Sequence, residues 1–298
     1  MKRRFVLILL TVALLIAPLT AHADMGPKPS LDITFTGLEG ETYYVALLAE
    51  APKDDFSTPL LRDNLDDAWD VGIDEATLVK FAQYESADGL FVLDGVENCT
   101  EKQHFSAGRF PPGSFKVLFY FPTTDHFVEG DKLYDAYAFN SSYTVHAEKI
   151  GLSAESSGVM TIPLVNSYRY VAVILSFLVR VFLTLSVELG IAWLFRLREK
   201  RLFRYIALVN LITQFVLTGI LAVLDYQSGL LYVILAYFVL ELIVCLVEAI
   251  LYAIRFHKIS ESKIRGWKPW IYSIVANTAS FFLGLFLATF ASLIPMSF

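Results

Sequence analysis

The chain has 298 residues, 55% of them hydrophobic, and a formal net charge of −6. Residues 24–166 contain 24 acidic and 9 basic residues, whereas residues 167–298 contain 6 acidic and 12 basic ones. An acidic, polar half followed by an apolar half with short basic clusters excludes a single soluble globule. It predicts an exported domain followed by a membrane domain, and we expect no nucleic-acid partner for so acidic an exterior.

The first residues, MKRRFVLILLTVALLIAPLTAHAD, contain the three parts of a secretory signal peptide. A basic start is followed by an apolar core at residues 5–16 and by the small-x-small sequence of residues 21–23. The pattern predicts a signal peptide at residues 1–23 that is cleaved after Ala23. An uncleaved N-terminal anchor is the alternative, although the apolar core is shorter than the about 20 residues that a membrane span needs.

Residues 24–166 read as short strands separated by turns, with one helix from the cap residue Asp74 to about Tyr84. The segments LDITFTG and TYYVALLAE flank a Gly-Leu-Glu-Gly turn, which predicts a β-hairpin. The segment FKVLFYFP alternates in the way typical of a half-buried strand. We expect this extracytoplasmic domain to be mainly β and sandwich-like, similar to an immunoglobulin or transthyretin fold. A less regular α+β domain is the alternative.

Three features of the exported domain are candidate chemical sites. The acidic stretch at residues 63–75 lacks the ligand spacing and the glycine of a calcium-binding loop, which favours a solvated loop. Cys99 and Cys245 fall in different domains, so we expect no disulfide, and a buried, unreactive thiol at Cys99. We expect no metal and no cofactor, because the three histidines of the domain lack the close spacing of metal ligands: His104, His126 and His146.

Four apolar stretches follow, each about 20–25 residues long and able to cross a bilayer as a helix. Five basic residues lie in the loop between the first and second stretches, five in the loop between the third and fourth, and none in the middle loop. The positive-inside rule places both basic loops in the cytoplasm and the exported domain and the C-terminus outside. We expect residues 167–298 to form a four-helix transmembrane domain, with spans at about 170–194, 205–224, 230–253 and 271–294.

Polar side chains interrupt these stretches at two depths, about ten and about eighteen residues from the outer ends of the spans. Glu241 and Glu248 are seven residues apart and therefore share one helix face. Ionisable residues inside a membrane are costly, and they are candidate functional residues by default. The candidate intramembrane polar cluster comprises Arg180, Glu188, Asn210, Gln214, Glu241, Glu248 and Asn277.

The shallower part of this cluster contains its only basic residue. An isolated charge at mid-membrane costs roughly 2.5–3.5 kcal/mol on insertion scales. Arg180 is too deep for its side chain to reach the headgroups comfortably. We therefore expect Arg180 to pair with Glu241, with Gln214 as a further partner, and so to help specify how the helices pack.

The deeper part of the cluster has two carboxylates and no base. Glu188 and Glu248 lack a basic residue at their own depth, and two nearby carboxylates in a low-dielectric setting do not both ionise. One hypothesis is therefore that a proton or a cation binds here. One alternative is a structural role, in which both side chains reach Arg196, Arg255 or cytoplasmic water, and another is contact with a partner helix.

The sequence contains no nucleotide-binding, zinc-protease or serine-hydrolase motif, and no histidine or aspartate deep in the spans. Residues 80–94, 110–122, 133–145, 208–217 and 241–252 resemble a group of uncharacterised bacterial membrane proteins, mainly from Gram-positive anaerobes. The resemblance covers nearly the whole chain and implies a signal peptide, an exterior β domain and four C-terminal helices. It implies no activity and transfers no catalytic residue.

These features together predict a non-enzymatic integral membrane protein whose exterior domain binds a ligand or a partner. The acidic exterior favours cationic ligands or basic partner surfaces. The helical domain would anchor it in the lipid bilayer or assemble with another membrane or envelope protein, in a sensory or accessory role for an envelope or transport complex. The alternative is a small transporter or channel component that uses the buried carboxylates for proton or cation coupling.

Overall fold

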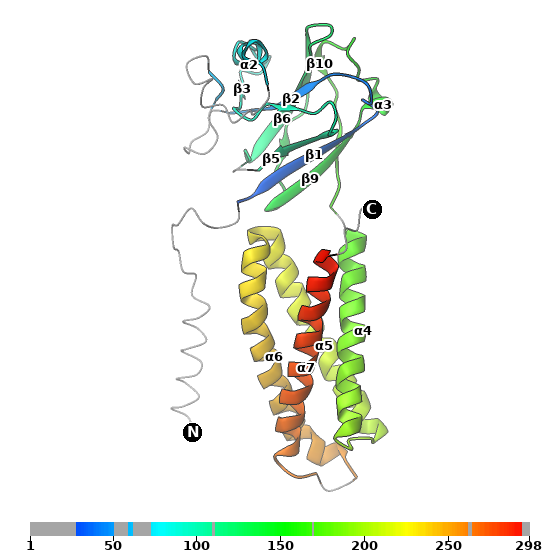
Figure 1. Cartoon of the computed structure of the whole chain (residues 1–298). Coiled ribbons are helices and arrows are strands. Elements are labelled where there is room, and N and C mark those ends of the chain that lie inside the picture. Colours follow the sequence, from blue (N-terminus) through cyan, green and yellow to red (C-terminus); the bar gives the residue numbers. More distant parts are fainter. Residues whose placement is uncertain are drawn as a thin grey trace, which may run out of the picture. The chain divides into compact units, whose positions relative to one another are not determined.

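The computed structural model describes residues 28–50, 59–61, 73–108, 111–168, 170–261 and 264–293. The predicted signal peptide lies outside these residues. The chain divides into two compact units (Figure 1). The first is mainly β and lies within residues 28–168, and the second is built from four long helices.

Two mixed sheets make up the β domain. One sheet has four strands in the order β11-β9-β1-β5, in which β1 and β9 are parallel. The other has seven strands, in the order β10-β7-β6-β2-β3, with β4 beside β2, β8 beside β6, and β10 parallel to β7. The strands are β1 (Ser30–Thr36), β2 (Tyr44–Ala49), β3 (Phe91–Val92), β4 (Glu97–Asn98), β5 (His104–Ala107), β6 (Ser114–Phe121), β7 (His126–Gly130), β8 (Tyr134–Asp135), β9 (Asn140–His146), β10 (Gly158–Met160) and β11 (Leu164–Asn166).

The hairpin predicted for the first two strands is wrong, because β1 and β2 belong to different sheets. β1 pairs with β5 and β9, whereas β2 pairs with β3, β4 and β6. Ile33 and Phe35 of β1 and Val45 and Leu47 of β2 are all buried in the same core. Crossing between the sheets lets the two strands close that core from opposite sides, which a single hairpin cannot do.

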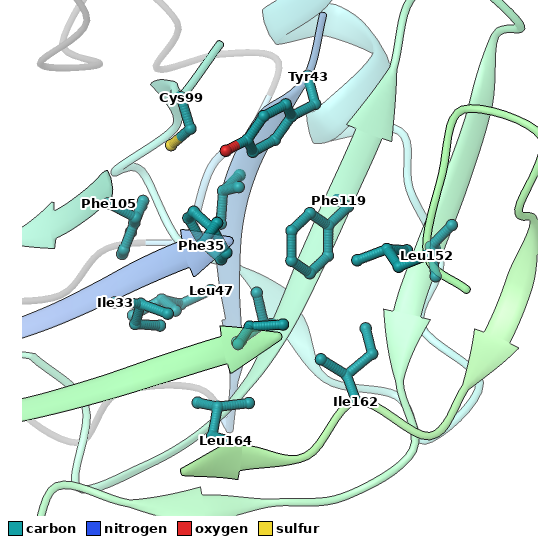
Figure 2. Packing of buried hydrophobic residues seen from close by; sticks show 14 of the residues in the cluster. Ile33, Phe35, Tyr43, Leu47, Cys99, Phe105, Phe119, Leu152, Ile162 and Leu164 are labelled. Carbon is teal, nitrogen blue, oxygen red and sulfur yellow. The ribbon is translucent and has the colours of Figure 1, made fainter. Parts of the chain in front are cut away.

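Aromatic and aliphatic side chains fill the space between the two sheets (Figure 2). The Phe35 ring meets the Phe119 ring of β6 edge to face, with 5.3 Å between the centroids, and Tyr43 lies 5.7 Å from Phe35. Cys99 is a free thiol with no exposed surface in this core. Burial raises the pKa of the Cys99 thiol, so it is a poor nucleophile, as the sequence predicts.

The central strand β6 differs from the half-buried strand that its sequence predicts, because both of its faces are buried. Side chains at every second position from Phe115 to Phe121 enter the core between the sheets. Leu118 and Tyr120 point to the other face, where they belong to a second hydrophobic cluster with Phe81. Phe81 lies on the helix α2 (Glu75–Ala82), which therefore forms an additional layer over this sheet.

The helix predicted after Asp74 is confirmed as α2, and Asp74 is its N-cap. The Asp74 carboxylate accepts a hydrogen bond from the Thr77 amide at 2.9 Å and another from the Thr77 hydroxyl at 2.8 Å. These bonds lower the pKa of Asp74. A short second helix, α3 (Ala147–Ile150), follows β9 and ends at Gly151 in the left-handed conformation.

Four helices run side by side in the helical domain (Figure 1). Among the described residues, three are long and apolar enough to cross a membrane, at Val173–Leu194, Lys200–Ser228 and Leu230–Ile259. The expectation of four such helices is corrected to three, because the last one is not among them. Its first half carries several polar side chains, and part of its second half lies outside the described side chains. The helices are α4 (Tyr170–Leu194), α5 (Lys200–Ser228), α6 (Leu230–Ile259) and α7 (Lys268–Leu293).

Gly37, at the end of β1, combines a positive φ of 81° with a close approach to another segment. A Cβ atom built there would lie 2.7 Å from the backbone nitrogen of Glu148, which has no rotamer by which to move away. We expect Gly37→Ala to lower the free energy of unfolding by more than the about 1–2 kcal/mol of left-handed strain alone. Gly40 has a φ of 91° and no atom close to the position of a Cβ, so Gly40→Ala measures the left-handed strain alone. Gly95→Ala is the control that has neither the strain nor a close approach. Equal costs at Gly37 and Gly40, measured by hydrogen exchange, would contradict the close approach.

Candidate functional site in the helical domain

Two glutamates without any exposed surface lie inside the helical domain. Glu188 is on α4 and Glu248 is on α6, and the exposed fraction of each is 0%. Among the residues that the structure describes, the side chains that hydrogen-bond to either carboxylate are all neutral. In these helices, therefore, Glu188 and Glu248 do not reach Arg196 or Arg255, as one predicted alternative had it.

Glu188 is held by α5 and α7. Asn210 Nδ2 donates to Glu188 Oε2 at 2.5 Å, and the Tyr272 hydroxyl lies 3.5 Å from the same oxygen and 3.3 Å from the Glu188 carbonyl. Asn210 Nδ2 also faces the Ile206 carbonyl at 3.2 Å and the Tyr252 hydroxyl at 2.9 Å. This amide thus links α4, α5 and α6 at one point.

Glu248 is held by α5 and α7 as well. The Thr213 hydroxyl donates to Glu248 Oε1 at 2.7 Å, and Asn277 Nδ2 donates to Glu248 Oε2 at 2.8 Å. Asn277 is itself fixed by a bond from Nδ2 to the Ser273 carbonyl at 3.0 Å. Both oxygens of Glu248 are therefore occupied, and the two carboxylates together connect all four helices.

An aromatic layer closes the bundle on the side of the α4–α5 and α6–α7 connections. The Tyr252 ring stacks on Phe256 with 4.9 Å between centroids and lies 5.5 Å from Tyr272, which in turn meets Phe195 at 5.9 Å. Apolar side chains complete the layer. Its buried members are Ala192, Leu197, Leu202, Ile206, Val209, Tyr252, Phe256, Ile264, Tyr272 and Ala276.

The predicted ion pair between Arg180 and Glu241 is not formed: among the described residues, no nitrogen of Arg180 lies within 4.0 Å of a Glu241 oxygen. Instead, the Arg180 guanidinium lies 5.7 Å from the centroid of the Tyr237 ring. Tyr237 precedes Glu241 by one helical turn, and its hydroxyl interacts with the Glu241 carboxylate. Gln214 is buried, and its Oε1 has no partner in the described part of the chain, so it joins neither residue.

Sequence reasoning missed the hydroxyl groups of the cluster. Thr213, Tyr252 and Tyr272 are common residues of apolar helices, and nothing in their type marks them as partners of a carboxylate. Tyr252 follows Glu248 by four residues, and Thr213 lies one position before Gln214. Helical spacing could have put Tyr252 on the carboxylate face, but the rotation of each helix about its own axis depends on packing.

The remaining candidate chemical sites lie in the β domain, and they are the acidic stretch and the three histidines. Of the acidic stretch at residues 63–75, all but the last three residues lie outside those that the structure describes. No group of three or more His, Cys, Asp or Glu side chains suited to a metal occurs among the described residues. The imidazoles of His104 and His146 lie 3.2 Å and 3.5 Å from Asp32 and Glu148 at partly exposed positions.

No family model matches this chain, and neither the curated proteins nor the solved structures contain one that is significantly similar to it.

Proposed function

We propose that this chain is a non-enzymatic, multi-pass protein of a bacterial plasma membrane whose exterior domain binds a partner or an envelope ligand. In this proposal the three long apolar helices α4–α6 span the membrane, and α7, which packs against α4 and α6, crosses with them. The exterior domain and the C-terminus face outward, and the connections after α4 and α6 face the cytoplasm. The basic residues of those two connections support this orientation.

The unbalanced negative charge of the exterior domain carries the proposal. Two of its few bases are engaged within the domain: Lys80 contacts Asp125 at 2.5 Å, and Lys116 pairs with Glu129 at 3.0 Å. The hydrogen bond from Lys80 lowers the pKa of Asp125, and the bond to Asp125 raises the pKa of Lys80. The remaining excess of carboxylates gives the surface a negative field, which attracts cationic ligands and basic partner surfaces.

The helical domain supports an accessory or sensory role for an envelope or transport complex. The hydrogen bonds of Glu188 and Glu248 tie the four helices to one another, so the cluster favours one packing of the bundle over others. Buried polar groups are best attested in such a specifying role. An anchor with one defined packing can transmit an event at the exterior domain to a membrane partner.

Photo-crosslinking in membranes of the producing cell tests this function. A photoreactive residue replaces Val165, which is 50% exposed on the edge strand β11. We expect a covalent adduct whose yield falls as the salt concentration rises. The reason is that salt at 0.1 M largely screens the attraction between exposed charges that are more than about 10 Å apart. The same residue at Leu242 of α6, 74% exposed, is the control and should give salt-independent adducts. No adduct at Val165, or a yield that salt leaves unchanged, would contradict a charge-steered partner.

A further inference from the structure

Three oxygens inside the helical domain have no hydrogen-bond donor among the described residues: Glu188 Oε1, Asn210 Oδ1 and Gln214 Oε1. The three side chains are 0%, 0% and 3% exposed. The hydroxyl of Thr218, one turn along α5 from Gln214, also lacks a partner there. Buried polar atoms almost always have a partner. A group of acceptors without a donor therefore indicates that a donor or a cation from outside the described residues completes it.

The three oxygens belong to neighbouring side chains. Asn210 and Gln214 are one turn apart on α5 and share a face, and the Asn210 amide touches the Glu188 carboxylate through Nδ2. The orientation of that amide is well determined, since Nδ2 faces the Glu188 carboxylate, the Ile206 carbonyl and the Tyr252 hydroxyl. Turning it over would direct Oδ1 at the carboxylate and at a carbonyl. Asn210 Oδ1 therefore remains an acceptor.

The charges around Glu188 do not balance. The titratable groups that face it are the Tyr272 hydroxyl from α7, Tyr252, Cys245 and Glu248 from α6 and, farther away, Glu241. The one base of the cluster, Arg180, belongs to the outer half of the bundle, over the Tyr237 ring. A buried carboxylate without a basic partner either takes up a proton or binds a cation.

We propose that one monovalent cation, a proton or Na⁺, binds at Glu188 with Asn210 and Gln214 as neutral oxygen ligands. This site goes beyond the partner binding proposed above. Both oxygens of Glu248 already accept hydrogen bonds, so of the two carboxylates only Glu188 presents an oxygen that is free to bind the cation. Carboxylate and amide oxygens are hard ligands, suited to a proton or an alkali ion and not to the soft metals that prefer thiolate.

The two ends of the bundle differ in how they enclose this site. The aromatic layer around Tyr252, Phe256 and Tyr272 is fully buried and closes one end. Toward the other end, the interior charged residues Arg180 and Glu241 are only partly buried. A smaller apolar cluster also fills the interior on that side, so both ends of the bundle enclose the site; its buried members are Leu217, Leu221 and Val244.

Thermal unfolding of the full-length protein in nanodiscs, with Na⁺ titrated against choline at alkaline pH, is the first half of the test. If Na⁺ is the occupant, Tm rises by roughly 5 °C or more at saturation, and Glu188→Gln removes the rise. If a proton is the occupant, Na⁺ and choline act alike. The infrared spectrum at neutral pH then shows the carbonyl band of a protonated carboxylic acid, which Glu188→Gln abolishes.

Variants and a matched control keep this test decisive. Glu241→Gln removes a carboxylate of the same helical domain outside the proposed site, and it should keep the wild-type response. Gln214→Leu removes one neutral ligand and should weaken the Na⁺ response about tenfold or more in apparent affinity. The site is overturned if the wild type shows neither a specific Na⁺ effect nor a protonated carboxyl. It is also overturned if either signal survives Glu188→Gln. The wild-type measurements decide even where a variant fails to fold.

Discussion

Replacing Glu129 with leucine is expected to lower the free energy of unfolding of the β domain by about 3–5 kcal/mol. Glu129 lies on β7 with no exposed surface. It accepts hydrogen bonds from Lys116 at 3.0 Å, from the Tyr84 and Ser86 hydroxyls at 3.0 Å each, and from the Ala87 amide at 3.3 Å. Leucine would leave these donors without their acceptor, and Lys116, 3% exposed, with Asp88 as its one remaining carboxylate partner.

Hydrogen exchange of peptides from β6 and β7 in the full-length protein measures this loss, because it reports the opening free energy of one domain. Glu85→Leu, at an exposed position of the same loop, is the matched control and should change stability by about 0.5 kcal/mol or less. The double variant Lys116→Met, Glu129→Leu should cost less than the sum of the single changes, since it leaves no buried charge. Equal costs for Glu129→Leu and Glu85→Leu would show that the pair is not buried.

The same pair predicts a pH dependence. Burial lowers the pKa of Lys116, but the hydrogen bonds to Asp88 and Glu129 outweigh it, so the net effect is a raised pKa. A lysine whose pKa is higher in the folded state contributes its full stabilisation below the unfolded pKa, about 10.4. That contribution is lost as the pH rises through the folded pKa. The double variant should lack this alkaline loss of stability.

Local signals in the sequence were sufficient for the helices and insufficient for the sheets. A long apolar run between polar loops predicts a long helix by itself, and α4 begins and ends where its run does. Strand pairing depends on segments far apart: β1 lies beside β9, more than a hundred residues away. The glycines after β1 suggested a hairpin, whereas the shared core of both strands required the chain to change sheets.

The position of Lys116 in β6 illustrates a second limit. A lysine within an alternating strand normally marks the solvent face, and the sequence gives no sign that Glu129 and residues 84–88 cover it. In the helical domain, counting depth along the spans places Glu188, Asn210, Glu248 and Asn277 in adjacent layers, and the structure brings them together. Depth says nothing of rotation about the helix axis. The sequence therefore does not predict that the Tyr237 ring, and not the Glu241 carboxylate, faces Arg180.

Replacing Phe81 with alanine is expected to lower the free energy of unfolding of the β domain by about 3–5 kcal/mol. Phe81 has no exposed surface, and its ring meets the rings of Tyr120 at 5.8 Å and of Phe127 at 5.2 Å. Alanine would leave a cavity between α2 and the sheet, and the short helix would lose its main apolar contact. Exchange of amides in α2 and β6 of the full-length protein should both accelerate, α2 by more.

The matched control for Phe81 is Phe91→Ala on β3, where the same ring is 44% exposed. Its removal creates no closed cavity, so we expect a cost of about 1 kcal/mol or less. The difference between the two substitutions measures how firmly α2 covers β6. If both cost the same, the outer face of β6 is open to solvent, as simple alternation predicts. A large difference means instead that the helical layer covers this face of the sheet, where Phe81 contacts the rings of Tyr120 and Phe127.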